Sequence, residues 1–176
     1  MLDGEQRRVL RGMVLAMAIT VAVLGLGGGL GWPALPVLPG VADQLGFALR
    51  CDLLVMIWLV AAVAAVARGR FFSAADIGGA GFGLPGARIA VASAVLQNTL
   101  EQAALAVTVH LGLASVLRGR EMVLVPLLVG LFCAGRLAFW MGYRHGAGGR
   151  ALGFGLTFYP SVLGLGVALV LMAIRE

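Results

Sequence analysis

The feature that most constrains this chain is a series of long apolar runs separated by short polar stretches. Each run approaches the ~20 residues that a helix needs to cross a hydrocarbon core about 30 Å thick. Lipid offers no hydrogen-bond partners, so runs of this length predict helices, whose backbone groups pair with one another. Only 12% of the residues are charged, whereas a soluble domain carries roughly 25%. The sequence therefore predicts an all-α fold, a polytopic transmembrane helix bundle.

Five spans are expected, and they cover approximately residues 13–32, 47–67, 88–117, 122–143 and 151–174. Between them, proline and glycine predict loops at 33–40 and 73–86. The first span follows three arginines, a pattern that it shares with cleaved signal peptides. Its length, and the lack of a small-residue cleavage site after it, favour a retained helix.

Arginine placement predicts the orientation of the bundle. All 13 basic residues are arginine, and with five spans they divide unequally between the two sides. If the N-terminus is cytoplasmic and the C-terminus outside, the cytoplasmic side collects eight of them: Arg7, Arg8, Arg11, Arg68, Arg70, Arg88, Arg144 and Arg150. The outer side then has four: Arg50, Arg118, Arg120 and Arg175. This asymmetry follows the positive-inside rule.

The net charge of +5 is also compatible with a nucleic-acid partner. However, the arginines flank the apolar runs, as membrane topology requires, so we expect no nucleic acid to bind.

A few polar residues interrupt the third and fourth spans. Asn98 and Glu101 are three residues apart and therefore share one face of the third span, while Arg136 and Tyr143 share a face of the fourth. Such residues are costly in lipid and usually face a bundle interior or a cavity. Two interpretations remain open: a polar ligand site, or a Glu101–Arg136 ion pair that only locks the bundle.

Other reactive side chains form no recognisable site. Cys51 and Cys133 lie in separate spans, outside any metal-ligand cluster, so we expect buried small side chains and no metal. His110 and His145 are expected near opposite membrane faces, which argues against a shared haem. Asp52 does not share a helix face with Arg50, so we expect each to reach the membrane surface or to find another partner.

Two motifs resemble those of a known family. The first is Asn98-x-x-Glu101; the second is the run Gly135-Arg136-Leu-Ala-Phe-Trp-Met-Gly-Tyr143, followed by Gly149-Arg150. In this order they resemble the family of membrane-associated proteins in eicosanoid and glutathione metabolism (MAPEG), in a bacterial-type member. The resemblance covers roughly residue 50 to the C-terminus. It implies residues 1–45 as an extra N-terminal transmembrane helix with its loop, and residues 46–176 as a four-helix MAPEG-like domain.

The resemblance further implies a homotrimer that binds glutathione between subunits near the cytoplasmic face. Asn98 and Glu101 are then expected to hold the glutathione backbone, with Glu101 at its ammonium group. Arg136 and Tyr143 are expected to contact its carboxylates or peptide groups. The remaining implied residues are the basic cluster that ends the first family helix and the arginine that stabilises the thiolate: Arg68 or Arg70, and Arg150.

The implied function is a glutathione transferase or peroxidase of a bacterial inner membrane, with lipophilic small molecules or membrane lipids as partners. The sequence departs from the family pattern at Ala94, Phe139 and Gln102, and these changes remove hydrogen-bond donors. They motivate an alternative from another class, a non-catalytic lipid-binding scaffold of the same fold. A small transporter or channel has little support, because few spans carry charge and no inverted repeat is evident.

Overall fold

The computed structural model describes residues 2–29, 38–79 and 83–175. Over these residues the chain is helical apart from short turns and caps. The long helices are α1 (Gly4–Gly29), α2 (Val41–Phe71), α3 (Ala87–Val116), α4 (Leu124–Gly142) and α5 (Gly146–Arg175). Two short 3₁₀ helices, η1 (Gly119–Val123) and η2 (Tyr143–His145), precede α4 and α5.

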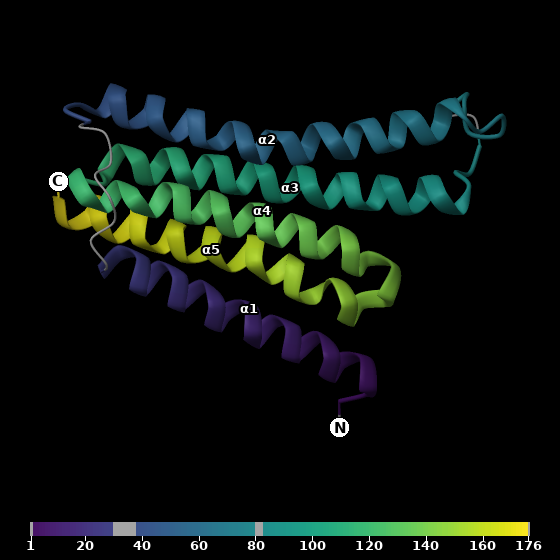
Figure 1. Cartoon of the computed structure of the whole chain (residues 1–176), viewed down its shortest axis with the longest axis horizontal. Coiled ribbons are helices and arrows are strands. Elements are labelled where there is room, and N and C mark those ends of the chain that lie inside the picture. The colour runs from purple at the N-terminus through teal and green to yellow at the C-terminus, as the bar shows by residue number, and fades with distance from the viewer. Residues whose placement is uncertain (1, 30–37, 80–82, 176) are drawn as a thin grey trace.

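The predicted fold class, an all-α transmembrane bundle, is confirmed. Four helical stretches in the described residues are long and apolar enough to cross a membrane, and the last of these joins α4 to α5. The chain reverses at η2, so α4 and α5 lie side by side (Figure 1). The chain is therefore an integral membrane protein.

Helices α1, α2 and α5 extend beyond the predicted spans, because residues outside the apolar run continue the helix. The largest difference is in α1, which begins at Gly4 although the apolar run begins at Met13. The start of α5 also comes earlier than predicted, at Gly146, which has a φ of +80° that favours glycine. Residues 30–37, which include the end of the first predicted span and most of the loop after it, lie outside the described residues.

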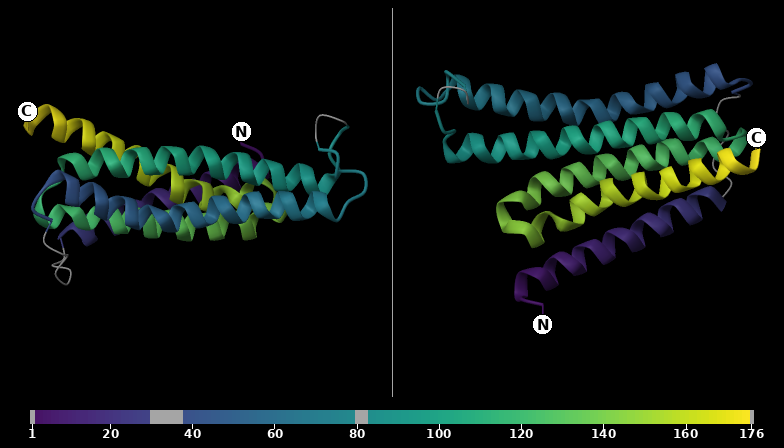
Figure 2. Two further views of the ribbon diagram at one scale, coloured as in Figure 1. Left: turned by 90° about the horizontal axis from the view of Figure 1, so that it is seen from above. Right: turned by 180° about the vertical axis from the view of Figure 1, so that it is seen from behind.

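The helices are arranged as a staggered stack (Figures 1 and 2). Helix α5 packs against α1, α4 and α3, whereas α2 packs against α3 and α4 at the opposite edge from α1. We call the end that carries η2 the N-terminal end of the bundle, and the end that carries η1 the C-terminal end. The α2–α3 hairpin projects past η2 at the N-terminal end (Figure 1).

Glycines allow α4 and α5 to approach closely. A Cβ atom added at Gly153 would overlap the backbone of Phe139, and one added at Gly135 would lie 2.9 Å from the carbonyl oxygen of Gly153. Small residues at transmembrane helix interfaces permit such backbone contact. This contact sets the distance between Arg136 on α4 and Thr157 on α5.

We therefore expect Gly153→Ala to destabilise the protein by about 1–3 kcal/mol or more, because the added methyl group overpacks a backbone contact. Gly166→Ala on the same helix is a matched control, since a Cβ atom at Gly166 meets nothing within 4 Å. The control should be neutral or stabilising by up to ~1 kcal/mol through helix propensity. Thermal unfolding in detergent measures both. Equal effects of the two substitutions would contradict the close α4–α5 contact.

A buried polar pair joins α2 to α3. The Nδ1 atom of His110 lies 2.6 Å from Oδ1 of Asp52, and both side chains are at most 4% exposed. The partner of Asp52 that the sequence left unidentified is thus His110. The sequence could not predict the contact between His110 and Asp52, because it depends on how α2 and α3 are aligned when they pack.

The C-terminal end is closed by a surface ion pair. Arg175 donates to both carboxylate oxygens of Glu121, at 2.8 and 2.7 Å, and so ties the end of α5 to η1. These hydrogen bonds from Arg175 hold the pKa of Glu121 below its ordinary value. The pair therefore contributes at neutral pH and is lost as the pH falls through the lowered pKa of Glu121.

Candidate functional site

The site is built around a guanidinium buried inside the bundle. Arg136 on α4 is 2% exposed; it donates from Nη1 to Oδ1 of Asn98 (2.9 Å) and from Nη2 to Oγ1 of Thr157 (2.6 Å). Its guanidinium carbon also lies 5.7 Å from the ring centroid of Phe132 and 4.6 Å from that of Phe139, within the range of cation–π attraction. Arg136 therefore links α3, α4 and α5 at one level of the bundle.

Glu101 takes no part in this link. Among the described residues it makes no ion pair with Arg136; instead its Oε1 atom accepts a hydrogen bond from Nε2 of Gln97 at 2.9 Å. Both Gln97 and Glu101 are exposed on the surface of this single chain. The interpretation of Glu101 and Arg136 as a bundle-locking pair is therefore wrong.

A pocket of about 430 Å³ lies beside Asn98, in the half of the bundle nearer its N-terminal end. This volume falls in the usual range for small-molecule sites, roughly 300–1,000 Å³. Four long helices and η2 contribute to its lining. The lining residues are Val9 and Met13 of α1, Ala94 and Asn98 of α3, Phe139 of α4, Tyr143 of η2, and Ala147, Arg150, Ala151 and Phe154 of α5.

Arg150 and Tyr143 are polar residues that line this pocket. The guanidinium carbon of Arg150 lies 4.6 Å from the centroid of the Tyr143 ring, and this ring meets Phe139 edge to face at 5.5 Å. The stacking holds the cation in place while its N–H groups remain able to donate. Arg150 lies in the first turns of α5, which begins before the predicted span of residues 151–174.

The predicted site residues are only partly brought together. Asn98, Tyr143 and Arg150 line the pocket. Arg136 does not line it but donates a hydrogen bond to Asn98. Arg68 lines a different pocket, of about 780 Å³, between the ends of α2 and α3, and Arg70 lies two residues further along α2. Neither arginine lines the pocket at Asn98 within this single chain. The ligand-binding roles assigned to all these residues remain predictions.

The sequence analysis missed two buried polar residues close to Arg136 or Asn98. Thr157 accepts a hydrogen bond from Arg136. In the sequence its only signal was a hydroxyl group in a span without charged residues. Gln102 was considered only as a departure from the family pattern, yet it is buried one turn from Asn98 on the same face of α3. In the described chain, Oε1 of Gln102 and Nε of Arg136 have no hydrogen-bond partner. Unsatisfied buried polar atoms of this kind are expected to take up water or ligand groups.

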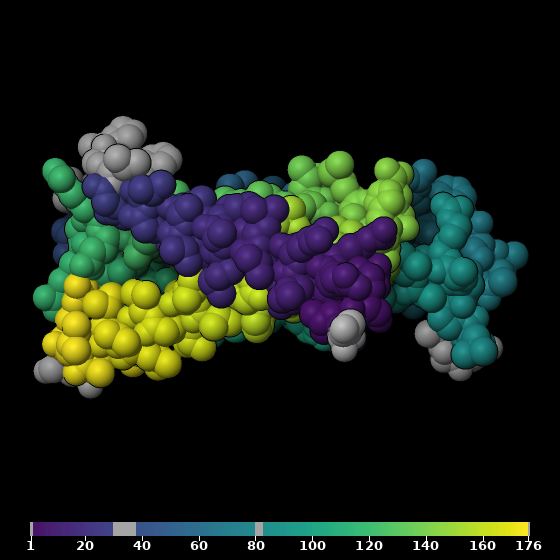
Figure 3. Space-filling model, turned by 90° about the horizontal axis from the view of Figure 1, so that it is seen from below, coloured from purple at the N-terminus to yellow at the C-terminus, as the bar shows by residue number. Residues whose placement is uncertain are grey.

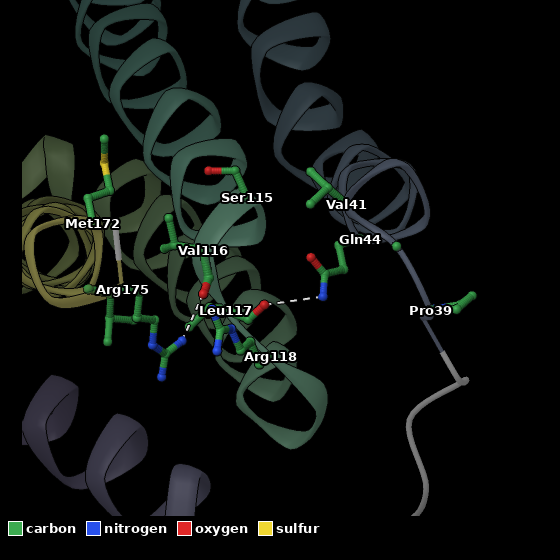
Figure 4. A pocket seen from close by; sticks show the side chains of 11 residues that line it. Pro39, Val41, Gln44, Ser115, Val116, Leu117, Arg118, Met172 and Arg175 are labelled. Carbon is green, nitrogen blue, oxygen red and sulfur yellow. Dashed lines mark hydrogen bonds between the residues drawn. The ribbon is translucent and has the colours of Figure 1, made fainter.

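Another pocket, of about 550 Å³, lies at the C-terminal end (Figure 4). There Nε2 of Gln44 donates to the carbonyl oxygen of Leu117 at 3.2 Å, and Nη1 of Arg175 donates to that of Val116 at 2.8 Å. These groups cap the end of α3, so their hydrogen-bonding capacity is used structurally.

In the described part of the chain, no group of three or more His, Cys, Asp or Glu side chains could hold a metal ion. Cys51 and Cys133 are free and partly buried, so they are less buried than expected. The polar side chains that line the pocket at Asn98 are those of Arg150, Tyr143 and Asn98 itself.

Comparison with known proteins identifies one relationship. A family model described as the MAPEG family matches residues 45–170, which is most of the chain and includes all of α3 and α4 and most of α2 and α5. No curated protein and no solved structure matches the chain. The matched region contains all the pocket residues except Val9 and Met13.

Proposed function

The chain belongs to the MAPEG family, and we propose that it is a glutathione-dependent transferase or peroxidase acting on lipophilic electrophiles. The observation that carries the proposal is the pocket in which Asn98, Tyr143 and Arg150 converge from three parts of the chain. This pocket offers a cation, a phenol and an amide to an anionic peptide, beside an apolar surface.

The proposed chemistry depends on ionising the glutathione thiol. A thiol with an ordinary pKa of about 8.5 is only a few per cent thiolate at pH 7. A guanidinium near the sulfur favours the thiolate and lowers that pKa. Arg150 is the cation that lines the pocket and is therefore assigned this role, while Tyr143 would donate a hydrogen bond to a peptide or carboxylate group.

The thiolate would then react with a substrate that reaches the pocket from the bilayer. In a transfer reaction the sulfur attacks an electrophilic carbon, the S–C bond forms, and the leaving group departs with its electron pair. In a peroxidase reaction the sulfur attacks a hydroperoxide oxygen, the O–O bond breaks and an alcohol leaves. The resulting sulfenic acid condenses with a second glutathione to give a disulfide and water.

The proposed assembly is a homotrimer, which is typical of the family. It is supported by Gln97 and Glu101, which are exposed at the middle of α3 in the single chain. A carboxylate facing lipid at this depth costs about 2.5–3.5 kcal/mol, and a neighbouring subunit would cover it. In such an assembly Glu101 could meet the glutathione ammonium group, and Arg68 or Arg70 of the partner subunit could complete the site.

The proposed location is a bacterial inner membrane, with a cytoplasmic N-terminus. The positive-inside rule supports this orientation, because Arg144 and Arg150 lie at the same end of the bundle as the N-terminus (Figure 1). The pocket would then open towards the cytoplasm.

Calorimetric titration of the detergent-purified protein with glutathione tests the function, with thiolate absorbance followed in parallel. We expect saturable binding and a thiol pKa below the value of free glutathione. The control is Arg120→Ala, which changes an exposed arginine at the other end of the bundle and should bind as the wild type does. An absence of binding at millimolar glutathione would contradict the proposal and favour the non-catalytic lipid-binding scaffold.

A further inference from the structure

We infer that α1 is a wall of the ligand pocket and that Val9 and Met13 select the apolar group that the site accepts. This inference deepens the proposed function and rests on it for the identity of the ligand's polar part. It concerns a helix that lies entirely outside the residues matched by the family model.

Helix α1 is packed closely enough to act as a fixed wall. A Cβ atom added at Gly12 would lie 3.0 Å from that of Ala151, and one added at Gly155 would lie 2.5 Å from Cβ of Ala16. Figure 3 shows α1 lying diagonally across α5 and α4. Because small residues on both helices bring the backbones together, α1 holds a defined register on α5.

A polar contact fixes the N-terminal end of α1 as well. Oε1 of Glu5 accepts a hydrogen bond from the backbone N–H of Gly148 at 2.8 Å. In addition, a Cβ atom added at Gly148 would lie 2.6 Å from Cβ of Arg8. These contacts lie one to two turns from Val9 and Met13, so they hold the wall at the level of Arg150.

The pocket is lined by polar and apolar groups, and α1 contributes only apolar ones. Asn98, Tyr143 and Arg150 supply its polar groups, whereas Val9 and Met13 carry none. The other apolar lining comes from Ala94 on α3, from Phe139 on α4, and from Ala147, Ala151 and Phe154 on α5. A ligand that matches this division has an anionic head at Arg150 and an apolar chain or ring beside α1.

Met13 is suited to a wall that sets specificity. It is partly buried, and its unbranched side chain adapts to apolar groups of different shape. The neighbouring residue Val14 is 61% exposed and does not line the pocket. If α1 served only as a membrane anchor, the two positions would be equivalent with respect to ligands.

The test is a titration of the full-length protein with glutathione and with S-butyl-, S-hexyl- and S-octylglutathione. In the wild type, affinity should rise by up to roughly fourfold for each methylene buried against the wall. Met13→Trp should weaken S-octylglutathione by about tenfold or more by filling that space, while glutathione affinity changes less than about twofold. Met13→Ala should shift the preference towards longer or bulkier groups.

Val14→Trp and Val14→Ala are the matched controls, and thermal unfolding of each variant verifies that it is folded. Wild-type chain-length dependence in both Met13 variants would overturn the inference and leave glutathione binding intact. If no variant binds glutathione, the proposed function fails, and dodecanoate then replaces the glutathione series as an anion with an alkyl chain. Weaker dodecanoate binding by Met13→Trp but not by Val14→Trp would still support the wall; no dodecanoate binding, or no such difference, would overturn it.

Discussion

Replacing Arg150 by alanine is expected to lower the turnover of a lipophilic electrophile at pH 7 by up to about 30-fold, because a thiol of pKa ~8.5 is only ~3% ionised at that pH. Arg150 lines the pocket, and its guanidinium carbon lies 4.6 Å from the centroid of the Tyr143 ring. Its loss also removes a charge-assisted hydrogen bond, worth about 1.5–3 kcal/mol in binding. Initial rates with saturating glutathione separate the first effect from the second.

The pH profile distinguishes thiolate stabilisation from a structural role. The wild-type rate should reach its plateau near neutral pH, since the bound thiol is already ionised there. The Arg150→Ala rate should keep rising through about pH 8.5, where the thiol ionises without help. The deficit should therefore shrink as the pH increases, which a misfolded site would not do.

Two further variants complete this test. Arg150→Lys keeps a positive charge but loses the planar group that stacks on Tyr143, so an intermediate rate is expected. Arg144→Ala removes an exposed arginine of η2 that does not line the pocket, and it should react as the wild type does. Unchanged turnover and an unchanged pH profile in Arg150→Ala would exclude the proposed mechanism.

The second large effect is expected at the buried Asp52–His110 pair. Asp52→Ala should destabilise the protein by about 3–5 kcal/mol, because removing one partner of a buried polar pair leaves the other unsatisfied. His110→Ala should have an effect of the same order. Both side chains are almost completely shielded, and Oδ2 of Asp52 already lacks a partner within the described residues. Unfolding in detergent, followed by circular dichroism, measures the change.

A double-mutant cycle isolates the interaction between the two residues. If the contact of 2.6 Å carries the effect, the double variant should be less destabilised than the sum of the two single variants, with a coupling of about 0.5–3 kcal/mol. Thr108→Ala on α3 is the control, since Thr108 is exposed in the single chain and bonds only within its own helix. Strict additivity of Asp52→Ala and His110→Ala would show that the pair is not energetically coupled.

Much of the fold was predictable from local sequence. A run such as that from Leu124 to Met141 is too long and too apolar for anything but a membrane helix, whatever surrounds it. The faces of the motif residues were also predictable, since helical periodicity places Asn98 with Glu101, and Arg136 with Tyr143. The face on which each of these residues lies needed no tertiary information.

The partners of the polar residues were not predictable in this way. Spacing made Glu101 a plausible partner of Arg136. The structure instead pairs Arg136 with Thr157, because Gly135 and Gly153 let α4 and α5 approach closely. Asp52 and His110 are separated by 58 residues, so only the antiparallel register of α2 and α3 brings them together.

The sequence by itself determined that this protein is a helical membrane bundle, because hydrophobic length and helical periodicity are local properties. Membership of the MAPEG family comes from the match to the family model. The tertiary structure decided which polar groups share a pocket and that α1, predicted only as an added span, supplies Val9 and Met13 to it. The physical reason is that any sufficiently long apolar run is stable as a helix in lipid, whichever helix lies beside it. Their neighbours and register depend on close packing between small residues, such as Gly12 and Ala151, and this packing is a property of helix pairs.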